Sequence, residues 1–392
     1  MDKKRILVVN DSVSNSSGVF RSLLPLLNAI PYDRFETALF IPPECAVEEA
    51  ALRLLPKDLS VVIGRDRVHY YRYPEVFFLH LCSRGCGMLR LKQPAAFFAR
   101  AARKRIRFRK LKNAASSVST ASPFDAVVAN TVPWCSEIAA LIPARRRYAV
   151  FHSSSASFFP EQTRAVFRDF DAVVAVSEGV ASMLRQAYPD RRAKLIAIPN
   201  YVDASAIRKL AAETAALEHN APVICSCGRL SREKGFDLAV EAARLLRERG
   251  FAFVWYFVGD GEERKKLEAL SEAYRLRERI RFVGFTDNPY PYIGGADIYV
   301  QPSYEEAQPM AIMEALTLSR AVVSTETLGG RTILQDGRGV LTPISAEGLA
   351  DGVASLLTDE NKRLSLQRPY KDEDDRAAKR AYESAWLKLL EE

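Results

Sequence analysis

The sequence has few histidines and no CxxC motif, and both shortages bear on its function. Among 392 residues there are four histidines and six cysteines, and no two cysteines are spaced as CxxC. We therefore do not expect a structural zinc site. The thiols are expected to be reduced and mostly buried.

Long apolar runs are also absent. The longest, such as "FAFVWYFV" at 251–258, have the length of a β-strand. A membrane-spanning helix needs about 20 apolar residues. The charged start "MDKKR" leads into a run that is too short for a secretory signal. We expect a cytoplasmic protein.

Short Val- and Ile-rich runs alternate with helix-like stretches over most of the chain. Examples are "RILVV", "PVICSCG" and two copies of "DAVVA". Such runs are typical of strands buried on both faces of a parallel sheet. In "GFDLAVEAARLLRERG", apolar residues recur at the spacing of one helix face. This alternation predicts an α/β fold, and the length fits two domains.

The alternation breaks at 201–220, which is polar and rich in alanine. We place the boundary between two α/β domains in this segment. Ligands of open parallel sheets bind beyond the carboxyl ends of the strands. The cleft between the two domains is therefore the expected site.

The stretch "CGRLSREKGFD" at 227–237 follows a predicted strand and precedes a predicted helix. Arg229 and Lys234 lie five positions apart in this turn, and the helix N-terminus adds amide donors. Two cations at one turn suit a diphosphate. Ordinary surface charge at a turn explains the pattern equally well.

The stretch "EEAQPMAIME" places Glu306 and Glu314 eight positions apart. Pro309 fits the first turn of a helix, where its missing N–H costs nothing. The amides of Met310 and Ala311 are then free donors. Carboxylates and free amides together suit the hydroxyls and oxygens of a sugar. The alternative is an ordinary buried helix with two incidental acids.

Two glycine-containing loops are candidate nucleotide-binding sites. "GDG" at 259–261 begins like a dinucleotide fingerprint, but Arg264 occupies the third glycine position. A nicotinamide-dependent dehydrogenase is therefore not expected. In "NDSVSNSSGVFRSLL", Gly18 allows the backbone to approach a phosphate or sugar. A plain loop between a strand and a helix is the alternative.

The net charge of +8 is concentrated at 89–112, which carries ten Lys or Arg residues and no acid. Phe and Leu are interleaved with the basic residues, as suits a surface of anionic lipid headgroups. A solvated helix face is the alternative. No nucleic-acid motif accompanies the charge.

Taken together, these motifs resemble glycosyltransferase family 4, whose members are retaining enzymes with the GT-B fold. The resemblance covers roughly 5–345 and is specific in the second half. It rests on "GRLSREKGFDLAVEAA", "YFVGDGEERKKLE", "RFVGFTDNPYPYIGGADIYVQPSYEEAQPMAIMEAL" and "AVVSTETLGGRTIL" in the family's order. It implies two Rossmann-like parallel-sheet domains facing across a cleft. These are an acceptor-side domain at 1–200, a nucleotide-sugar-binding domain at 201–370, and a helix at 371–392 that packs back on the first.

The resemblance also implies roles for the donor-binding residues. Arg229 and Lys234 would bind the diphosphate, and Glu314 the ribose hydroxyls. Phe285 would contact the base through its backbone, and Gly18 would approach the diphosphate from the other domain.

Four further residues would surround the transferred sugar. Glu306 would touch it and support catalysis, and His152 would face it. The amides near Met310 and Ala311 would hold sugar or phosphate oxygens. The chain departs from the family's pattern at Ala307, where glycine is usual, and at 319–321, where Ser-Arg-Ala replaces Gly-Lys-Pro.

The implied function is a metal-independent transfer of a sugar from a nucleotide-sugar donor, with a UDP-sugar expected. The acceptor would be a lipid-linked glycan or oligosaccharide in synthesis of a bacterial surface polysaccharide such as capsule or lipopolysaccharide. Segment 89–112 would then dock peripherally on the inner face of the plasma membrane, and no nucleic acid is involved. Two alternatives remain open, a nucleotide-sugar 2-epimerase and a catalytically silent partner subunit on the same fold.

Overall fold

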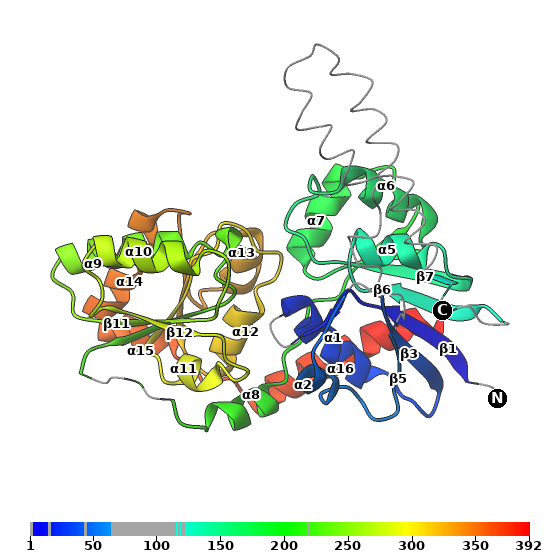
Figure 1. Ribbon diagram of the computed structural model, residues 1–392, viewed down its shortest axis with the longest axis horizontal. Helices are drawn as coiled ribbons and strands as arrows, with labels where there is room; N and C mark the ends of the chain where they lie inside the picture. Colours follow the sequence, from blue (N-terminus) through cyan, green and yellow to red (C-terminus); the bar gives the residue numbers. More distant parts are fainter. Residues whose placement is uncertain are drawn as a thin grey trace, which may run out of the picture.

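The protein has two lobes, each built around its own parallel sheet (Figure 1). The structure is a computed structural model that describes residues 3–14, 17–42, 45–63, 115–116, 118, 122–215, 217 and 220–392. The basic segment 89–112 lies outside the described residues, so its role at a lipid surface stays a prediction. The two sheets confirm the expected α/β class.

The first sheet has seven strands in the order β5-β3-β1-β6-β7-β8-β9, and every neighbouring pair is parallel. Its strands are β1 (Lys4–Val9), β3 (Phe35–Ile41), β5 (Ser60–Ile63), β6 (Phe124–Ala129), β7 (Ala144–Phe151), β8 (Ala172–Ala175) and β9 (Lys194–Ala197). Ile6, Leu7 and Val8 of β1, an inner strand of this sheet, are fully buried. The two "DAVVA" runs are β6 and β8 of this one sheet, as predicted.

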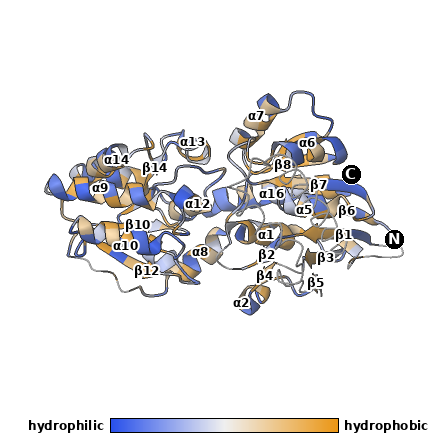
Figure 2. Ribbon diagram, turned by 45° about the horizontal axis from the view of Figure 1, so that its top comes forward, coloured by the Kyte–Doolittle hydropathy of each residue, from blue (hydrophilic) through white to orange (hydrophobic). Residues whose placement is uncertain are grey.

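Helices pack against this sheet and turn their polar residues outward (Figure 2). They are α1 (Gly18–Ala29), α2 (Glu49–Leu52), α5 (Trp134–Ala139), α6 (Pro160–Asp169) and α7 (Glu178–Ala187). Side-chain caps fix two helix starts that face the cleft. The hydroxyl of Ser17 accepts from the amide of Phe20 at 3.3 Å, and that of Ser177 from the amide of Val180 at 3.2 Å. Two short strands, β2 (Ser12–Val13) and β4 (Ala46–Val47), form a separate parallel pair. In the chain β2 precedes α1, and β4 follows β3.

The second sheet has six parallel strands in the order β12-β11-β10-β13-β14-β15. They are β10 (Val223–Cys227), β11 (Val254–Val258), β12 (Ile280–Gly284), β13 (Ile298–Gln301), β14 (Ala321–Thr325) and β15 (Val340–Thr342). Its helices are α9 (Phe236–Glu248), α10 (Arg264–Ala273), α11 (Tyr290–Gly294), α12 (Met310–Thr317), α13 (Leu328–Leu334), α14 (Ala346–Thr358) and α15 (Glu360–Leu366). Trp255 packs edge-on against Phe257 in the core of this lobe.

The chain crosses between the lobes twice. After β9 it passes to α8 (Ala204–Ala211), and after α15 it returns as α16 (Asp372–Glu391), which lies against α1 (Figure 1). Trp386 of α16 belongs to the core of the first lobe. Arg208 of α8 donates to the carbonyl of Tyr370 at 3.2 Å, so the two crossings are tied together. The domain boundaries at 200 and 370 remain our proposal.

Candidate functional site

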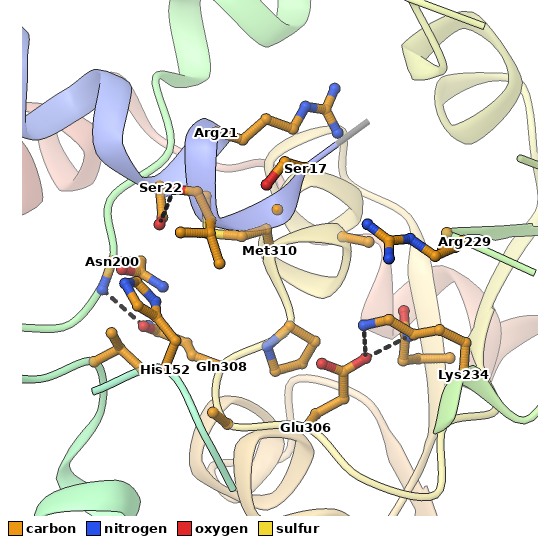
Figure 3. Close-up of a pocket in the computed structure, with 18 of the residues that line it drawn as sticks. Ser17, Arg21, Ser22, His152, Asn200, Arg229, Lys234, Glu306, Gln308 and Met310 are labelled. Carbon is orange, nitrogen blue, oxygen red and sulfur yellow. Dashed lines mark hydrogen bonds and ion pairs between the residues drawn. The ribbon is translucent and has the colours of Figure 1, made fainter. Parts of the chain in front are cut away.

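A cavity of about 360 Å³ lies between the two lobes (Figure 3). On one side it is lined by the start of α1 and by the segments that follow β7, β8 and β9. On the other side it is lined by the segments that follow β10 and β13 and by the start of α12. Every predicted site residue except Phe285 lines it. These are Gly18, His152, Arg229, Lys234, Glu306, Met310, Ala311 and Glu314. The structure therefore brings together residues that lie up to about 300 positions apart in the chain.

The turn after β10 places Lys234 at the cavity. A short 3₁₀ turn, η3 (Arg232–Lys234), ends at Gly235, whose φ of 64° is in the left-handed region. A Cβ at Gly235 would lie 2.1 Å from the carbonyl oxygen of Pro302, so only glycine fits. This close approach sets Lys234 beside the loop that carries Glu306.

Glu306 is 8% exposed and accepts three hydrogen bonds on Oε1. Its donors are Lys234 Nζ at 2.8 Å, Ser303 Oγ at 2.8 Å and Gln301 Nε2 at 3.1 Å. Within the described part of the chain, no hydrogen bond reaches Oε2. Glu306 is thus held as a fixed carboxylate with one oxygen available to a ligand.

Arg229 projects toward the same cavity (Figure 3). Its guanidinium donates no hydrogen bond to any residue that the structure describes. Lys234 is engaged by Glu306 at 2.8 Å, whereas Arg229 keeps its donors for another partner. The turn therefore presents two cations to the cavity, Lys234 in an ion pair with Glu306 and Arg229 with its guanidinium donors available to a ligand. Two such cations suit a diphosphate.

The predicted position of Pro309 was wrong by one residue. Pro309 is the N-cap of α12, with a ψ of 107° outside the helical range, and the helix begins at Met310. The extended conformation at Pro309 carries the loop from Ala307 into the helix. Because Met310 and Ala311 are the first two helical residues, their amides have no acceptor within the helix. Both line the cavity, as predicted.

Glu314 lies in the second turn of α12 and is 2% exposed. The hydroxyl of Tyr290 donates to its Oε1 at 3.2 Å, and Arg21 Nη1 lies 3.5 Å from the same oxygen. Oε2 is buried and has no hydrogen-bond partner in the described ranges. A buried carboxylate oxygen without a donor is costly, so a ligand hydroxyl is a fitting partner.

His152 follows the last residue of β7 at the cavity wall, and it is half-buried with its Nε2 atom out of contact with solvent. Burial lowers its pKa to about 4, and a backbone hydrogen bond with Asn130 opposes this shift only in part. The imidazole is therefore neutral at neutral pH. Its Nε2 has no hydrogen-bond partner among the residues described.

Phe285 lies in an adjoining cavity of about 430 Å³, which also borders Arg229. Its ring is 51% exposed. The "GDG" loop also lines this cavity, and close packing against the backbone explains why glycine is needed in it. Gly259 has a φ of 140°, and a Cβ there would lie 1.9 Å from the carbonyl oxygen of Gly228. The loop thus brings the ends of β10 and β11 together, which the failed dinucleotide pattern did not reveal.

Sequence reasoning missed the residues that support the two glutamates. Arg21 and Tyr290 hold Glu314, and Ser303 and Gln301 hold Glu306. Ser303 and Gln301 stand in the quoted motif "DIYVQPSYEE", but nothing in their types marks them as ligands of a carboxylate. Across the cavity, the side chain of Gln308 accepts from the amide of Asn200 at 2.7 Å, another contact between the lobes (Figure 3).

No three or more His, Cys, Asp or Glu side chains in the described ranges are grouped so that they can hold a metal ion. Within the same ranges, no helix combines the length and apolar character needed to cross a membrane.

Residues 208–371 match the family model "Glycosyl transferases group 1". This match spans the second lobe and identifies that lobe as a group 1 glycosyltransferase domain. This glycosyltransferase is 28% identical over 262 residues to "Lipopolysaccharide core biosynthesis glycosyltransferase LpsE" of Rhizobium meliloti, a match that covers 66% of this chain and 74% of that protein. The resemblance found in the motifs is thereby confirmed.

A Campylobacter jejuni relative is 28% identical over 213 residues, covering 53% of this glycosyltransferase and 56% of the relative. It is named "N-acetylgalactosamine-N,N'-diacetylbacillosaminyl-diphospho-undecaprenol 4-alpha-N-acetylgalactosaminyltransferase". Four other curated relatives are matched over only 34% to 38% of their length.

The solved structure of an S. aureus TarM mutant, in complex with Fondaparinux, alpha-GlcNAc-glycerol and UDP, has a TM-score of 0.71 to this glycosyltransferase. The match covers 99% of this chain and 100% of TarM at 10% sequence identity. It shows the shared fold, and it confirms the predicted GT-B architecture of two Rossmann-like domains.

Proposed function

We propose that this glycosyltransferase moves a sugar from a nucleotide-sugar donor to a glycan acceptor, with retention of the anomeric configuration. The observation that carries the proposal is the cavity where uncommitted Arg229, the Lys234–Glu306 pair and Glu314 converge. A UDP-sugar is the proposed donor, and UDP in the TarM complex supports it.

The donor is placed along the wall formed by the second lobe. Its diphosphate lies against Arg229 and Lys234, and the two protein cations stabilise the departing nucleotide without a metal in this proposal. Its ribose hydroxyls meet Glu314, and its base enters the cavity beside Phe285. A Cβ at Gly18 would have no atom of the described residues within 4 Å, so none of their packing contacts requires glycine there. Close approach of the diphosphate gives this glycine a reason.

The transferred sugar then lies between Glu306, His152 and the first amides of α12. Glu306 holds a sugar hydroxyl through Oε2 and supports positive charge at the anomeric carbon. The neutral imidazole of His152 suits a hydrogen bond to another hydroxyl. The leaving phosphate accepts the acceptor's proton on the face from which it departs, so the new bond forms on that same face.

The acceptor is proposed to be a lipid-linked glycan of bacterial surface-polysaccharide synthesis. The names of the Rhizobium and Campylobacter relatives support this choice, since one names lipopolysaccharide core and the other a diphospho-undecaprenol. Segment 89–112 would bring the enzyme to the cytoplasmic face of an anionic membrane. The comparisons give the epimerase alternative no support, and a silent partner subunit would not need four charged groups kept in one cavity.

The stereochemical test follows the first product formed from a UDP-sugar. Donors are first screened by their effect on the melting temperature, since a bound donor stabilises the native state. We then expect early proton NMR spectra to display the donor's own anomeric configuration in the product. An inverted anomeric signal would refute the proposed mechanism, and epimerised donor would refute transfer itself.

Replacing Glu314 with alanine is expected to weaken binding of UDP and of the UDP-sugar equally. A hydrogen bond to a charged group contributes about 1.5–3 kcal/mol, which corresponds to a loss of about ten- to 150-fold. Isothermal titration calorimetry measures both affinities. Glu326→Ala is the control, because Glu326 forms an exposed ion pair with Arg331 in the same lobe. Unchanged affinity in Glu314→Ala would assign Glu314 a purely structural role.

A further inference from the structure

Arg21 is the contact that the first lobe makes with the proposed ribose-binding carboxylate. It lies in the first turn of α1, and its side chain is 27% exposed. Nη1 lies 3.5 Å from Oε1 of Glu314, and Nη2 donates to the hydroxyl of Tyr290 at 3.3 Å. The guanidinium also stands 5.6 Å from the centre of the Tyr290 ring.

The three side chains form a connected cluster from both lobes. Tyr290 accepts from Arg21 and donates to Glu314, so its hydroxyl links the cation to the carboxylate. The charge of Glu314 raises the pKa of Arg21. A buried carboxylate needs such a cation, because removing one partner of a buried pair leaves an uncompensated charge.

The two carboxylate oxygens of Glu314 have different surroundings in this cluster. Both Arg21 and Tyr290 reach Oε1, while Oε2 is buried without a hydrogen-bond partner in the described ranges. Holding Oε1 from two sides fixes the rotation of the carboxylate. The remaining lone pairs that a ribose hydroxyl can use are then those of Oε2.

We propose that Arg21 is a positioning residue for ribose recognition, acting from the first lobe through Tyr290 and Oε1 of Glu314. The inference rests on the proposed function, since it takes Glu314 as the ribose acceptor. Arg21 also borders the diphosphate cavity and the base cavity. Recognition of the nucleotide half of the donor therefore depends on both lobes facing each other.

The experiment compares UDP with 2′,3′-dideoxy-UDP, which lacks both ribose hydroxyls, by calorimetry. The unmodified protein is expected to prefer UDP by about tenfold or more. In Arg21→Met the ratio of the affinity for UDP to that for 2′,3′-dideoxy-UDP is expected to fall toward one, mainly because UDP binds more weakly. Arg21→Lys keeps the charge and is expected to recover part of the preference. Tyr290→Phe removes the linking hydroxyl and is expected to lower it without removing any charge.

The matched control is Arg185→Met, because Arg185 forms an exposed ion pair with Glu178 at 2.7 Å in the first lobe. Its preference for UDP is expected to equal that of the unmodified protein, and melting temperatures monitor folding of every variant. If Arg21→Met and Tyr290→Phe keep the full preference, the inference is wrong. An equal loss for both nucleotides would instead indicate a direct phosphate contact and would also overturn it.

Failure of the proposed function gives a different result. If the unmodified protein binds neither nucleotide, the UDP-sugar proposal fails and this inference fails with it. If it binds both nucleotides equally well, Glu314 is not the ribose acceptor, although sugar transfer from UDP-sugars stands.

Discussion

Replacing Glu306 with glutamine is expected to lower the turnover of sugar transfer at least a hundredfold while the affinity for UDP changes little. The carboxylate is nearly buried, and three donors fix Oε1. Glutamine has the same shape but no negative charge, so it cannot support the positive charge that grows at the anomeric carbon. Loss of one contact made mainly in the transition state typically lowers kcat by about 10²–10³.

The neighbouring acid provides a matched control for this substitution. Glu305 is adjacent in sequence and exposed, and among the described residues its carboxylate accepts one long hydrogen bond, of 3.3 Å, from Ser154. Glu305→Gln is expected to keep turnover within a few-fold of the unmodified protein. Steady-state kinetics with the donor found by thermal screening measure both variants. Full activity in Glu306→Gln would contradict the catalytic role. Residues 305–314 would then be an ordinary start of a buried helix with two incidental acids.

Replacing Arg229 with alanine is expected to lower kcat/KM by up to about a thousandfold. At an effective dielectric of 20, a close charge pair contributes about 4 kcal/mol, and each 1.36 kcal/mol is a factor of ten in rate. The charge on the leaving diphosphate grows during the reaction. Arg229→Ala should therefore reduce the transfer rate more than it weakens the binding of free uridine.

Arg232 is the control for Arg229, since it stands in the same turn but is not among the residues that line the two cavities beside Arg229. Arg232→Ala is expected to retain nearly full activity. Comparing single-turnover rates with uridine and UDP affinities separates chemistry from binding. Equal turnover in Arg229→Ala and the unmodified protein would contradict the assignment of Arg229 to the leaving group.

The strands and the main site residues were predictable because their signals are local. A buried parallel strand is a continuous apolar run, and "RILVV" and "PVICSCG" became β1 and β10 in the centres of their sheets. The spacing of Glu306 and Glu314 predicted that both face one cavity, since a short loop followed by just over one helical turn separates them. Elements and motifs of this kind depend on near neighbours in the chain.

The contacts that complete the site were not predictable, because they join distant segments. Arg21 and Glu314 are separated by most of the chain, and no spacing rule connects an α1 residue with an α12 residue. The start of α12 was displaced by one residue because Pro309 keeps an extended ψ of 107°, which the preference of proline for the first helical position did not predict. The glycines of "GDG" resembled a phosphate motif, whereas close packing on Gly228 requires at least Gly259.

The double crossing of the chain between the lobes limits how the cavity can open. A single linker would allow one lobe to swivel about it in any direction. Here two covalent connections run side by side, and Arg208 joins the first to Tyr370 in the second. The hydroxyl of Tyr201 adds a bond of 3.1 Å to Asp375. We therefore expect any relative motion of the lobes to be close to a rotation about the line of these two connections. Opening along that line would separate Arg21 from Glu314.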